Sequence, residues 1–220
     1  GEQAAIEKIK KMNAGFPIKV LKNRENYGLG GSHKVAFNYA IENNFDYIIV
    51  LHGDDQGSIS DMIPVLKNGA FKKYDCCLGG RFAKGSKLVG YSKFRTFGNL
   101  VFNVTFSISV GKRILDLGAG LNLYSTRMLK SKYYEKFPDN LTFNCYMLFA
   151  LASYKQTYRF VPIVWREEDQ VSNVKMTRQA WQTLKMAVSY FFGRKKFMLK
   201  DAREKKFKEY KSDVVFSTED

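Results

Sequence analysis

The first half of the chain alternates between short apolar runs and stretches with helical periodicity. Apolar residues recur at helical spacing over residues 2–12 and 30–43, whereas residues 16–21 and 75–79 are short runs of the β type. Residues 46–51 read DYIIVL, a continuous apolar run typical of a strand buried on both faces of a parallel sheet. Strands that alternate with helices indicate βαβ units, so we predict an α/β fold with a mainly parallel sheet flanked by helices.

The pattern changes after Gly80. The expected elements there are helices over residues 92–110 and 143–154 and strands over residues 121–124 and 158–164. We expect the first of these helices to be broken at Gly98, and the last forty residues to be basic and helical. The sequence therefore predicts one domain over residues 1–176 and a basic amphipathic helical appendage over residues 177–220.

Composition and charge limit the classes of protein to which this chain can belong. The 220 residues are 45% hydrophobic and 15% aromatic, which is enough to bury a core and unlike a disordered chain. Lys and Arg outnumber Asp and Glu by 36 to 21, and the resulting net charge of +15 favours anionic partners such as phosphorylated ligands, nucleic acid or acidic lipid headgroups. The three cysteines, two of them adjacent, do not form a disulfide framework and favour a reducing compartment.

The residues directly after the DYIIVL strand are the first candidates for chemistry, because ligands of parallel α/β sheets bind beyond the carboxyl ends of the strands. They read His52-Gly53-Asp54-Asp55-Gln56. Adjacent carboxylates beside an imidazole and a carboxamide suit a divalent cation, Mg²⁺ or Mn²⁺, that also binds substrate phosphates. The alternative is a polar turn in which an Asp caps the next helix.

A glycine-rich segment, Gly28-Leu29-Gly30-Gly31-Ser32, precedes the second predicted helix. It lacks the G-K-[ST] ending of a phosphate-binding loop. We therefore expect a glycine-tolerant turn in which Ser32 serves as the helix N-cap.

DYIIVLHGDDQ resembles the strand and D-x-D-x-Q motif of the family-two inverting glycosyltransferases, in particular the polyprenyl-phosphate sugar transferase branch (dolichyl-phosphate mannosyltransferase-like). Three further segments are similar to motifs of that branch in the same order: GGRF at 79–82, DLGAGLNLY at 116–124, and VPI at 161–163 followed by Arg166 and SNVK at 172–175. The resemblance implies a nucleotide-sugar-binding fold of the GT-A, Rossmann-like type. It also leads us to expect a catalytic domain that is N-terminally incomplete, because the family's first strand region has no counterpart in this sequence.

Carried over position by position, the resemblance implies a role for each residue of the strand-end cluster. Asp54 would hold the metal that bridges the nucleotide diphosphate, with Gln56 as a neighbouring ligand, while His52 stands where the family has its first Asp. Imidazole can bind Mn²⁺ but lacks the negative charge. The candidate catalytic carboxylates are Asp54, Asp55 and Asp116, although Asp116 can equally cap the glycine turn that follows it.

Four further residues match family positions that bind substrate, chiefly by neutralising phosphate. They are Arg81, Arg166, Ser172 and Lys175. Such charges would stabilise the nucleoside diphosphate as it leaves.

The segment Phe143-Asn144-Cys145-Tyr146 departs from the family pattern. Members of the branch often carry F-Q-x-E there, and other family-two enzymes an E-D pair with a catalytic base, whereas this chain has no carboxylate. A sugar hydroxyl needs a base to remove its proton, while a phosphate acceptor is already ionised. The departure therefore favours a phosphate acceptor.

The C-terminal part carries an apolar stripe with helical spacing. Trp181, Leu184, Val188 and Phe191 lie at i, i+3, i+7 and i+10, and basic residues follow from Arg194 onward. An aromatic, basic amphipathic helix suits the plane of an anionic membrane surface, so we predict that this stripe faces a membrane. The alternative is that it packs on the domain itself. No apolar run is long enough to span a bilayer.

These features predict a metal-dependent, inverting glycosyltransferase of cell-envelope biosynthesis, peripheral on the cytoplasmic face of the membrane. It would move a hexose from a nucleotide diphosphate sugar to a polyprenyl phosphate. One alternative transfers the sugar to a saccharide hydroxyl in surface polysaccharide or lipopolysaccharide synthesis. A basic nucleic-acid-binding module would explain the charge but lacks a recognition motif, so no nucleic-acid partner is expected; an inactive homologue serving as a scaffold is a fourth possibility.

Overall fold

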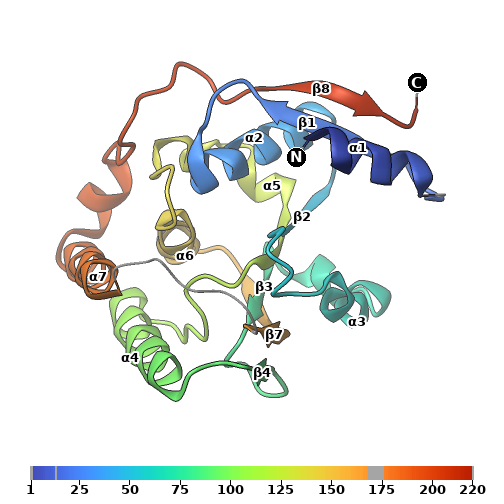
Figure 1. Ribbon diagram of the computed structural model, residues 1–220. Coiled ribbons are helices and arrows are strands. Elements are labelled where there is room, and N and C mark those ends of the chain that lie inside the picture. Colours follow the sequence, from blue (N-terminus) through green and yellow to red (C-terminus); the bar gives the residue numbers. More distant parts are fainter. Residues whose placement is uncertain (1, 13, 168–175, 220) are drawn as a thin grey trace.

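The computed structural model of the protein describes residues 2–12, 14–167 and 176–219, over which helices and strands alternate (Figure 1). The α-helices are α1 (Glu2–Lys11), α2 (Gly28–Glu42), α3 (Ile63–Lys67), α4 (Lys93–Val110), α5 (Thr126–Leu129), α6 (Phe143–Ser153) and α7 (Met176–Leu199). Short 3-10 helices cover Ile59–Met62, Ala70–Lys73 and Tyr133–Lys136. The strands are β1 (Lys19–Asn23), β2 (Tyr47–Leu51), β3 (Cys76–Gly80), β4 (Lys87–Val89), β5 (Leu121–Ser125), β6 (Tyr158–Pro162), β7 (Val164–Arg166) and β8 (Ser212–Ser217).

The main sheet has four strands in the order β2-β5-β3-β6. Strand β5 runs antiparallel to both of its neighbours, whereas β3 and β6 are parallel. Two small sheets lie beside it, an antiparallel β1–β8 pair and a parallel β4–β7 pair. The α/β class is confirmed, but the expectation of a mainly parallel sheet is wrong: the sheet is mixed because β5 is inserted between β2 and β3 in the opposite direction.

Hydrophobic cores cover both faces of the main sheet, because successive side chains of a strand point to opposite faces. Leu78 of β3 and Tyr124 of β5 pack in the core that includes α2, α4, α6 and α7. Cys77 and Leu123 face the other core, beside α3 and β7. Residues 143–151 of α6 are buried throughout, so this helix is enclosed by the others (Figure 1).

Two expectations about helices are wrong. Helix α4 continues through Gly98 without a break, because a glycine within a helix lowers its stability but does not interrupt its hydrogen bonds. The last forty residues are not helical throughout: α7 ends at Leu199, and the chain then crosses the domain to form β8 against β1.

Helix α2 begins at Gly28, so Ser32 is not its N-cap; the Ser32 hydroxyl lies inside the helix and donates to the Gly28 carbonyl (2.9 Å). The glycines allow the start of α2 to lie directly against the backbone of Pro138 and Asp139. A Cβ on Gly30 would lie 2.4 Å from the Pro138 carbonyl oxygen, and the Gly30 N–H donates to the Asp139 carbonyl (2.8 Å). Gly28 has a φ of +71°, in the left-handed region that glycine adopts readily.

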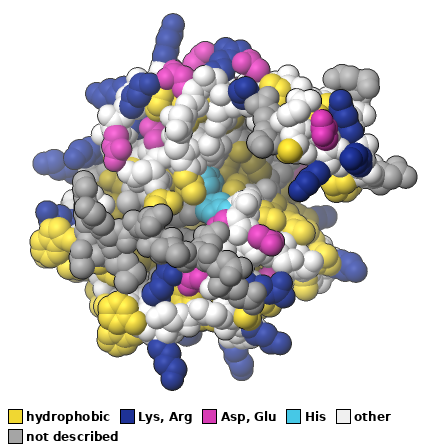
Figure 2. All heavy atoms as spheres, in the orientation of Figure 1, with side chains coloured by type: hydrophobic (Ala, Val, Ile, Leu, Met, Phe, Trp, Pro, Cys, Tyr) yellow, Lys and Arg dark blue, Asp and Glu magenta, His cyan; other side chains and the backbone are white. Residues whose placement is uncertain are grey.

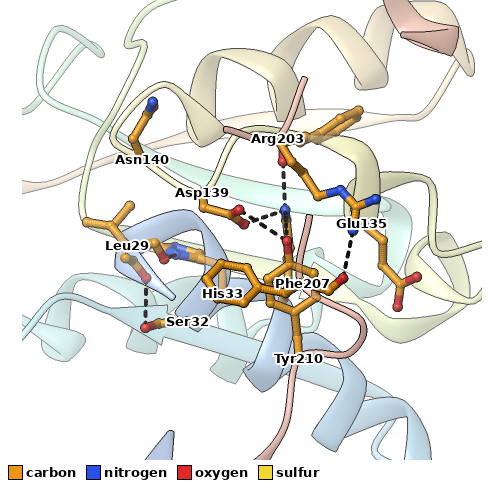
Figure 3. Close-up of polar contacts among 12 residues, drawn as sticks. Leu29, Ser32, His33, Glu135, Asp139, Asn140, Arg203, Phe207 and Tyr210 are labelled. Atoms are coloured by element: carbon orange, nitrogen blue, oxygen red, sulfur yellow. Dashed lines mark hydrogen bonds and ion pairs between the residues drawn. The ribbon is translucent and has the colours of Figure 1, made fainter. Parts of the chain in front are cut away.

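The segment after α7 is fastened to α2 through a buried lysine, Lys34. Figure 3 shows Tyr210 of this segment close to Asp139, which binds the same lysine. The Lys34 ammonium is fully buried and donates to the Phe137 carbonyl (2.6 Å), the Asp139 carboxylate (2.6 Å) and the Tyr210 hydroxyl (3.1 Å). The Tyr210 hydroxyl donates in turn to Asp139 (3.1 Å). Burial lowers the pKa of Lys34, although the Asp139 carboxylate opposes the shift. Segments far apart in sequence are thus joined by one charge network.

Candidate active site

The loop after β2 carries the predicted cluster on a tight turn. The Asp54 carboxylate is half-buried and accepts from the Gln56 backbone N–H (3.2 Å). Asp55 has a φ of +58°, which aspartate tolerates better than most residues, and its side chain is exposed. The Gln56 carbonyl accepts from the backbone N–H of Arg166 in β7 (3.0 Å). The fold therefore places Arg166 beside the acidic loop.

Two imidazole rings lie behind this loop. The backbone N–H of His52 donates to the Gly120 carbonyl (2.8 Å), and the His52 ring packs so closely on Gly120 that a Cβ there would be 2.8 Å from Nδ1. The ring centroids of His52 and His33 are 5.6 Å apart. The Nδ1 of His33 pairs with the Leu29 carbonyl (2.8 Å), while Nε2 of each histidine is buried and has no hydrogen-bond partner among the described residues. Figure 2 shows the histidine side chains at the bottom of a hollow, with acidic side chains beside it.

Burial sets the charge of both histidines. It lowers the pKa of His33 to about 4, against a smaller opposing contribution from the Leu29 carbonyl. Burial also lowers the pKa of His52, and the charge of Asp54 opposes it. Both rings are therefore neutral at physiological pH and can offer a lone pair.

Arg81 and Asp116, which the sequence places in separate motifs, form a buried ion pair. Arg81 Nη2 and Nε donate to the two carboxylate oxygens at 2.7 and 2.8 Å, and the Arg81 and Gly118 backbone N–H groups donate to the same carboxylate (2.8 and 3.1 Å). Burial by itself would lower the pKa of Arg81, but the charge and hydrogen bonds of Asp116 outweigh it and raise the pKa. Asp116 thus caps the glycine turn and holds the guanidinium at the same time.

Aromatic side chains surround the guanidinium. It lies 5.3 Å from the centroid of the Trp165 ring and within 6 Å of the Tyr91 and Phe82 rings. Arg81 Nη1 also donates to the Tyr91 hydroxyl (3.3 Å). The Trp165 ring reaches the acidic loop as well, since a Cβ on Gly57 would lie 3.5 Å from it. Trp165 therefore connects the loop to the Arg81–Asp116 pair.

The donors of the acidic loop fit a divalent cation that completes its coordination elsewhere. Among the described residues, no three His, Cys, Asp or Glu side chains gather closely enough to hold a metal by themselves. The loop supplies one half-buried carboxylate, Asp54, and the buried, unpartnered Nε2 of His52. Mg²⁺ and Mn²⁺ bind through one or two protein ligands plus substrate phosphates, and an imidazole ligand favours Mn²⁺ over Mg²⁺.

A groove of about 570 Å³ begins next to the ion pair. Phe82 and Leu115, the neighbours in sequence of Arg81 and Asp116, line it together with one side of α4. The α4 side is mostly apolar and includes Leu100, Val104 and Ile108, while Lys112 and Arg113 line the groove beyond the end of the helix. The groove thus combines apolar walls with positive charge.

The remaining predicted positions are placed as follows. Phe143, Asn144, Cys145 and Tyr146 are buried in the first turn of α6, and the Asn144 Oδ1 has no partner among the described residues. Ser172 and Lys175 lie outside the described residues. Trp181, Leu184, Val188 and Phe191 are exposed along α7. Searching the described residues finds no helix that is both long and apolar enough to cross a bilayer.

The sequence did not single out His33, Tyr91 or Trp165 as site residues. Trp165 is the one with a usable signal: it immediately precedes the predicted Arg166, in a strand that follows the V-P-I motif. His33 and Tyr91 approach the site only through contacts with residues distant in sequence.

Comparison with known proteins agrees with this arrangement. No curated protein matches the chain. The profile of Glycosyl transferase family 2 matches residues 1–151, which include the acidic loop and the Arg81–Asp116 pair. Enzymes of this family transfer a sugar from a donor to an acceptor, have the GT-A fold and typically use a divalent metal. The match covers more than half of the sequence, and the chain is therefore a glycosyltransferase that belongs to glycosyl transferase family 2.

Proposed function

We propose that this glycosyltransferase moves a hexose from a nucleotide diphosphate sugar to a polyprenyl phosphate at the cytoplasmic face of a membrane, with inversion at the anomeric carbon. The observation that carries the proposal is the groove between α4 and residues 111–115. It is mostly apolar along α4, lined by Lys112 and Arg113 at one end, and begins beside the Arg81–Asp116 pair. An isoprenoid chain with a phosphate head needs this combination of surfaces.

The acidic loop is the donor side of the proposed site. Asp54, His52 and Gln56 would hold a divalent cation, which neutralises the diphosphate as it leaves. The protein contributes a rigid turn, since the loop is fastened through Gln56 to Arg166 and through His52 to Gly120. Such a turn keeps the ligands in place without reorganisation during the reaction.

Arg81 and Arg166 would bind substrate phosphate and stabilise the nucleoside diphosphate as it leaves, as the family resemblance implies, together with Ser172 and Lys175. The pairing of Asp116 with Arg81 supports a positioning role for Asp116, because its oxygens accept four hydrogen bonds from the surrounding N–H groups. Of the three candidate carboxylates, this leaves Asp54 and Asp55 on the loop itself.

The absence of a carboxylate at residues 143–146 supports a phosphate acceptor. These side chains are buried, and none of them can take up a proton from a sugar hydroxyl. A polyprenyl phosphate is an ionised nucleophile, so the site needs only to orient it and to neutralise the leaving group.

An assay of sugar transfer tests both sides of the site. Nucleotide sugars are screened with a short polyprenyl phosphate or a free saccharide, in Mg²⁺ or Mn²⁺. We expect transfer to the lipid phosphate, and Asp54→Asn should lower kcat/KM on the order of 100-fold because the metal loses a carboxylate ligand.

The matched control is Asp46→Asn, since Asp46 is an exposed aspartate just before β2, at the opposite end of the strand. It should leave the rate unchanged. Equal rates for the Asp54 and Asp46 variants would refute the metal role. Transfer to the saccharide but not to the lipid phosphate would refute the acceptor and favour the polysaccharide alternative.

A further inference from the structure

Helix α4 buries both polar and apolar side chains on its inner side, including Asn103 and Phe106, and carries a continuous row of apolar side chains on its outer side. The inner side chains bind the following loop: Asn103 donates to the Leu115 carbonyl (2.7 Å), and the Ser107 hydroxyl accepts from the Ile114 N–H (2.8 Å). The outer apolar side chains recur at spacings of three and four residues and are 47% to 71% exposed; they are Phe94, Phe97, Val101, Val104 and Ile108. The outer face of a surface helix is ordinarily polar, so this apolar outer face is suited to a partner other than water.

Helix α7 lies beside α4 and presents a second stripe of the same kind (Figure 1). Its inner residues, such as Ala187 and Tyr190, are fully buried, while the outer residues Trp181, Leu184, Val188, Phe191 and Phe192 are exposed. Arg194 of α7 donates to the Ser109 carbonyl of α4 (3.4 Å), which joins the two helices. In Figure 2, hydrophobic side chains protrude at the left and lower left, over α7 and α4.

The charged residues of the two helices are all basic, and Arg95 of α4 pairs with Glu167 next to β7. Neither helix contains an Asp or a Glu. Among the side chains that the structure describes, the exposed basic residues on the two helices and just beyond α4 are Lys93, Lys112, Arg113, Lys185, Lys195, Lys196 and Arg194. Lys185 lies over the Trp181 ring, 5.2 Å from its centroid. The partner of this surface must therefore accept apolar and aromatic side chains and also carry negative charge.

We propose that α4 and α7 together form a docking surface that lies in the plane of an anionic lipid bilayer. Aromatic and aliphatic side chains enter the boundary between headgroups and acyl chains, and the Lys and Arg side chains pair with acidic headgroups. A second copy of the chain would bring positive charge against positive charge. A nucleic acid would pair with the basic residues but would leave two apolar stripes in water.

Vesicle binding by the full chain tests this surface without any sugar donor, so its outcome is independent of the proposed transfer reaction. Phosphatidylcholine vesicles with and without phosphatidylglycerol are sedimented with the protein at low and high salt. We expect binding to the anionic vesicles, at least about tenfold weaker binding to phosphatidylcholine alone, and loss of binding as salt is raised.

A paired set of variants assigns the binding to the two helices. Phe97→Asp combined with Ile108→Glu should weaken binding at least about tenfold, because both charges would enter the apolar region. The control combines Phe16→Asp with Val214→Glu, which are equally exposed apolar positions elsewhere, 66% and 53% exposed, and it should bind like the wild type. Far-ultraviolet circular dichroism and the unfolding midpoint verify that each variant is folded.

Tryptophan fluorescence of the unmodified protein gives a second readout. The chain has two tryptophans, of which Trp165 is buried and Trp181 is 58% exposed. We expect brominated lipids to quench Trp181 and a Trp181→Phe variant to lose the quenching. The proposal is overturned if the wild type does not bind anionic vesicles or if the stripe and control variants bind equally. It is also overturned if sedimentation equilibrium shows that the stripes hold two copies of the chain together instead.

Discussion

A buried arginine sets the character of the site at the scale of single residues. Arg81 is surrounded by Phe82, Tyr91 and Trp165, and its charge is balanced by Asp116. Removing one member of a buried pair leaves the other charge desolvated without compensation, which costs far more than the pair contributes. The geometry of this corner therefore depends on Asp116 even if the carboxylate never touches the substrate.

The first residue-scale prediction concerns this pair. Asp116→Asn should lower the free energy of unfolding by about 3–5 kcal/mol, because Arg81 loses its ionic partner in a buried setting. Urea denaturation measures the change. Arg127→Ala removes the exposed partner of Asp75 and serves as the control, with an expected loss below about 1 kcal/mol. Similar small losses in both variants would contradict the assignment.

The second residue-scale prediction concerns pH. The folded protein holds His33 neutral, because burial lowers its pKa to about 4 from the ordinary 6.5. The unfolded chain binds the proton already below pH 6.5, so unfolding takes up protons and stability falls as the pH drops from 6.5 toward 4. At one pKa unit per 1.36 kcal/mol, the full effect is about 3 kcal/mol.

Unfolding free energies at pH 7 and pH 4.5 test this for the wild type and His33→Gln. The variant should lose about 2–3 kcal/mol less than the wild type between the two pH values. The groups that face the ring are the Leu29 carbonyl, the His52 ring and the Phe143 ring, and all of them are present in both proteins. Identical losses would show that His33 is not protonated on unfolding.

At the scale of elements, the segment after α7 packs on the N-terminal part of the chain and holds it in place. Tyr210 and Phe207 pack edge-to-face against Tyr27, with ring centroids 5.3 and 4.9 Å away. Strand β8 then pairs with β1 along its length. Neither β1 nor β8 belongs to the main sheet, so each depends on the other and on this aromatic cluster.

Substitution of Tyr210 tests how much the packing of this segment contributes to stability. Tyr210→Ala should cost about 3–5 kcal/mol through loss of the buried ring. Tyr210→Phe keeps the ring but removes the hydroxyl that binds Lys34 and Asp139, and it should cost about 1–3 kcal/mol. Urea denaturation gives the totals, and faster hydrogen exchange of β1 amides locates the effect. The exposed Val214→Ala on β8 is the control and should change stability by less than about 0.5 kcal/mol.

The sequence predicts elements well where one periodicity dominates. The expected ranges for α2, β2, β5 and α6 agree with the structure to within two residues at each end. Strand β8 could not be predicted, because its short apolar run at Val214–Phe216 follows many charges and its partner lies nearly two hundred residues away. The continuity of α4 through Gly98 depends on its packing against α6 and α7 rather than on local propensity.

At the scale of the whole molecule, the direction of a strand within the sheet cannot be predicted from its sequence. A strand buried on both faces, such as β5, has the same apolar pattern whichever way it runs. Its antiparallel insertion between β2 and β3 is set by long-range pairing. The acidic loop was predictable because it directly follows an apolar run that forms β2, although β2 is a half-buried edge strand antiparallel to β5 and not, as expected, a strand buried on both faces of a parallel sheet. The Arg81–Asp116 pair and the buried Lys34 network, in contrast, join distant segments that no local pattern connects.

The exposed apolar row on α4 also limits how the molecule can be regulated. Rolling the helix about its axis to hide its outer face would separate Asn103 and Ser107 from the backbone of Leu115 and Ile114. Those groups would then lose their partners, so the apolar outer side stays exposed as long as these hydrogen bonds persist. Attachment would accordingly be constitutive, adjusted by the lipid composition and ionic strength of the surroundings rather than switched by the arrival of the sugar donor.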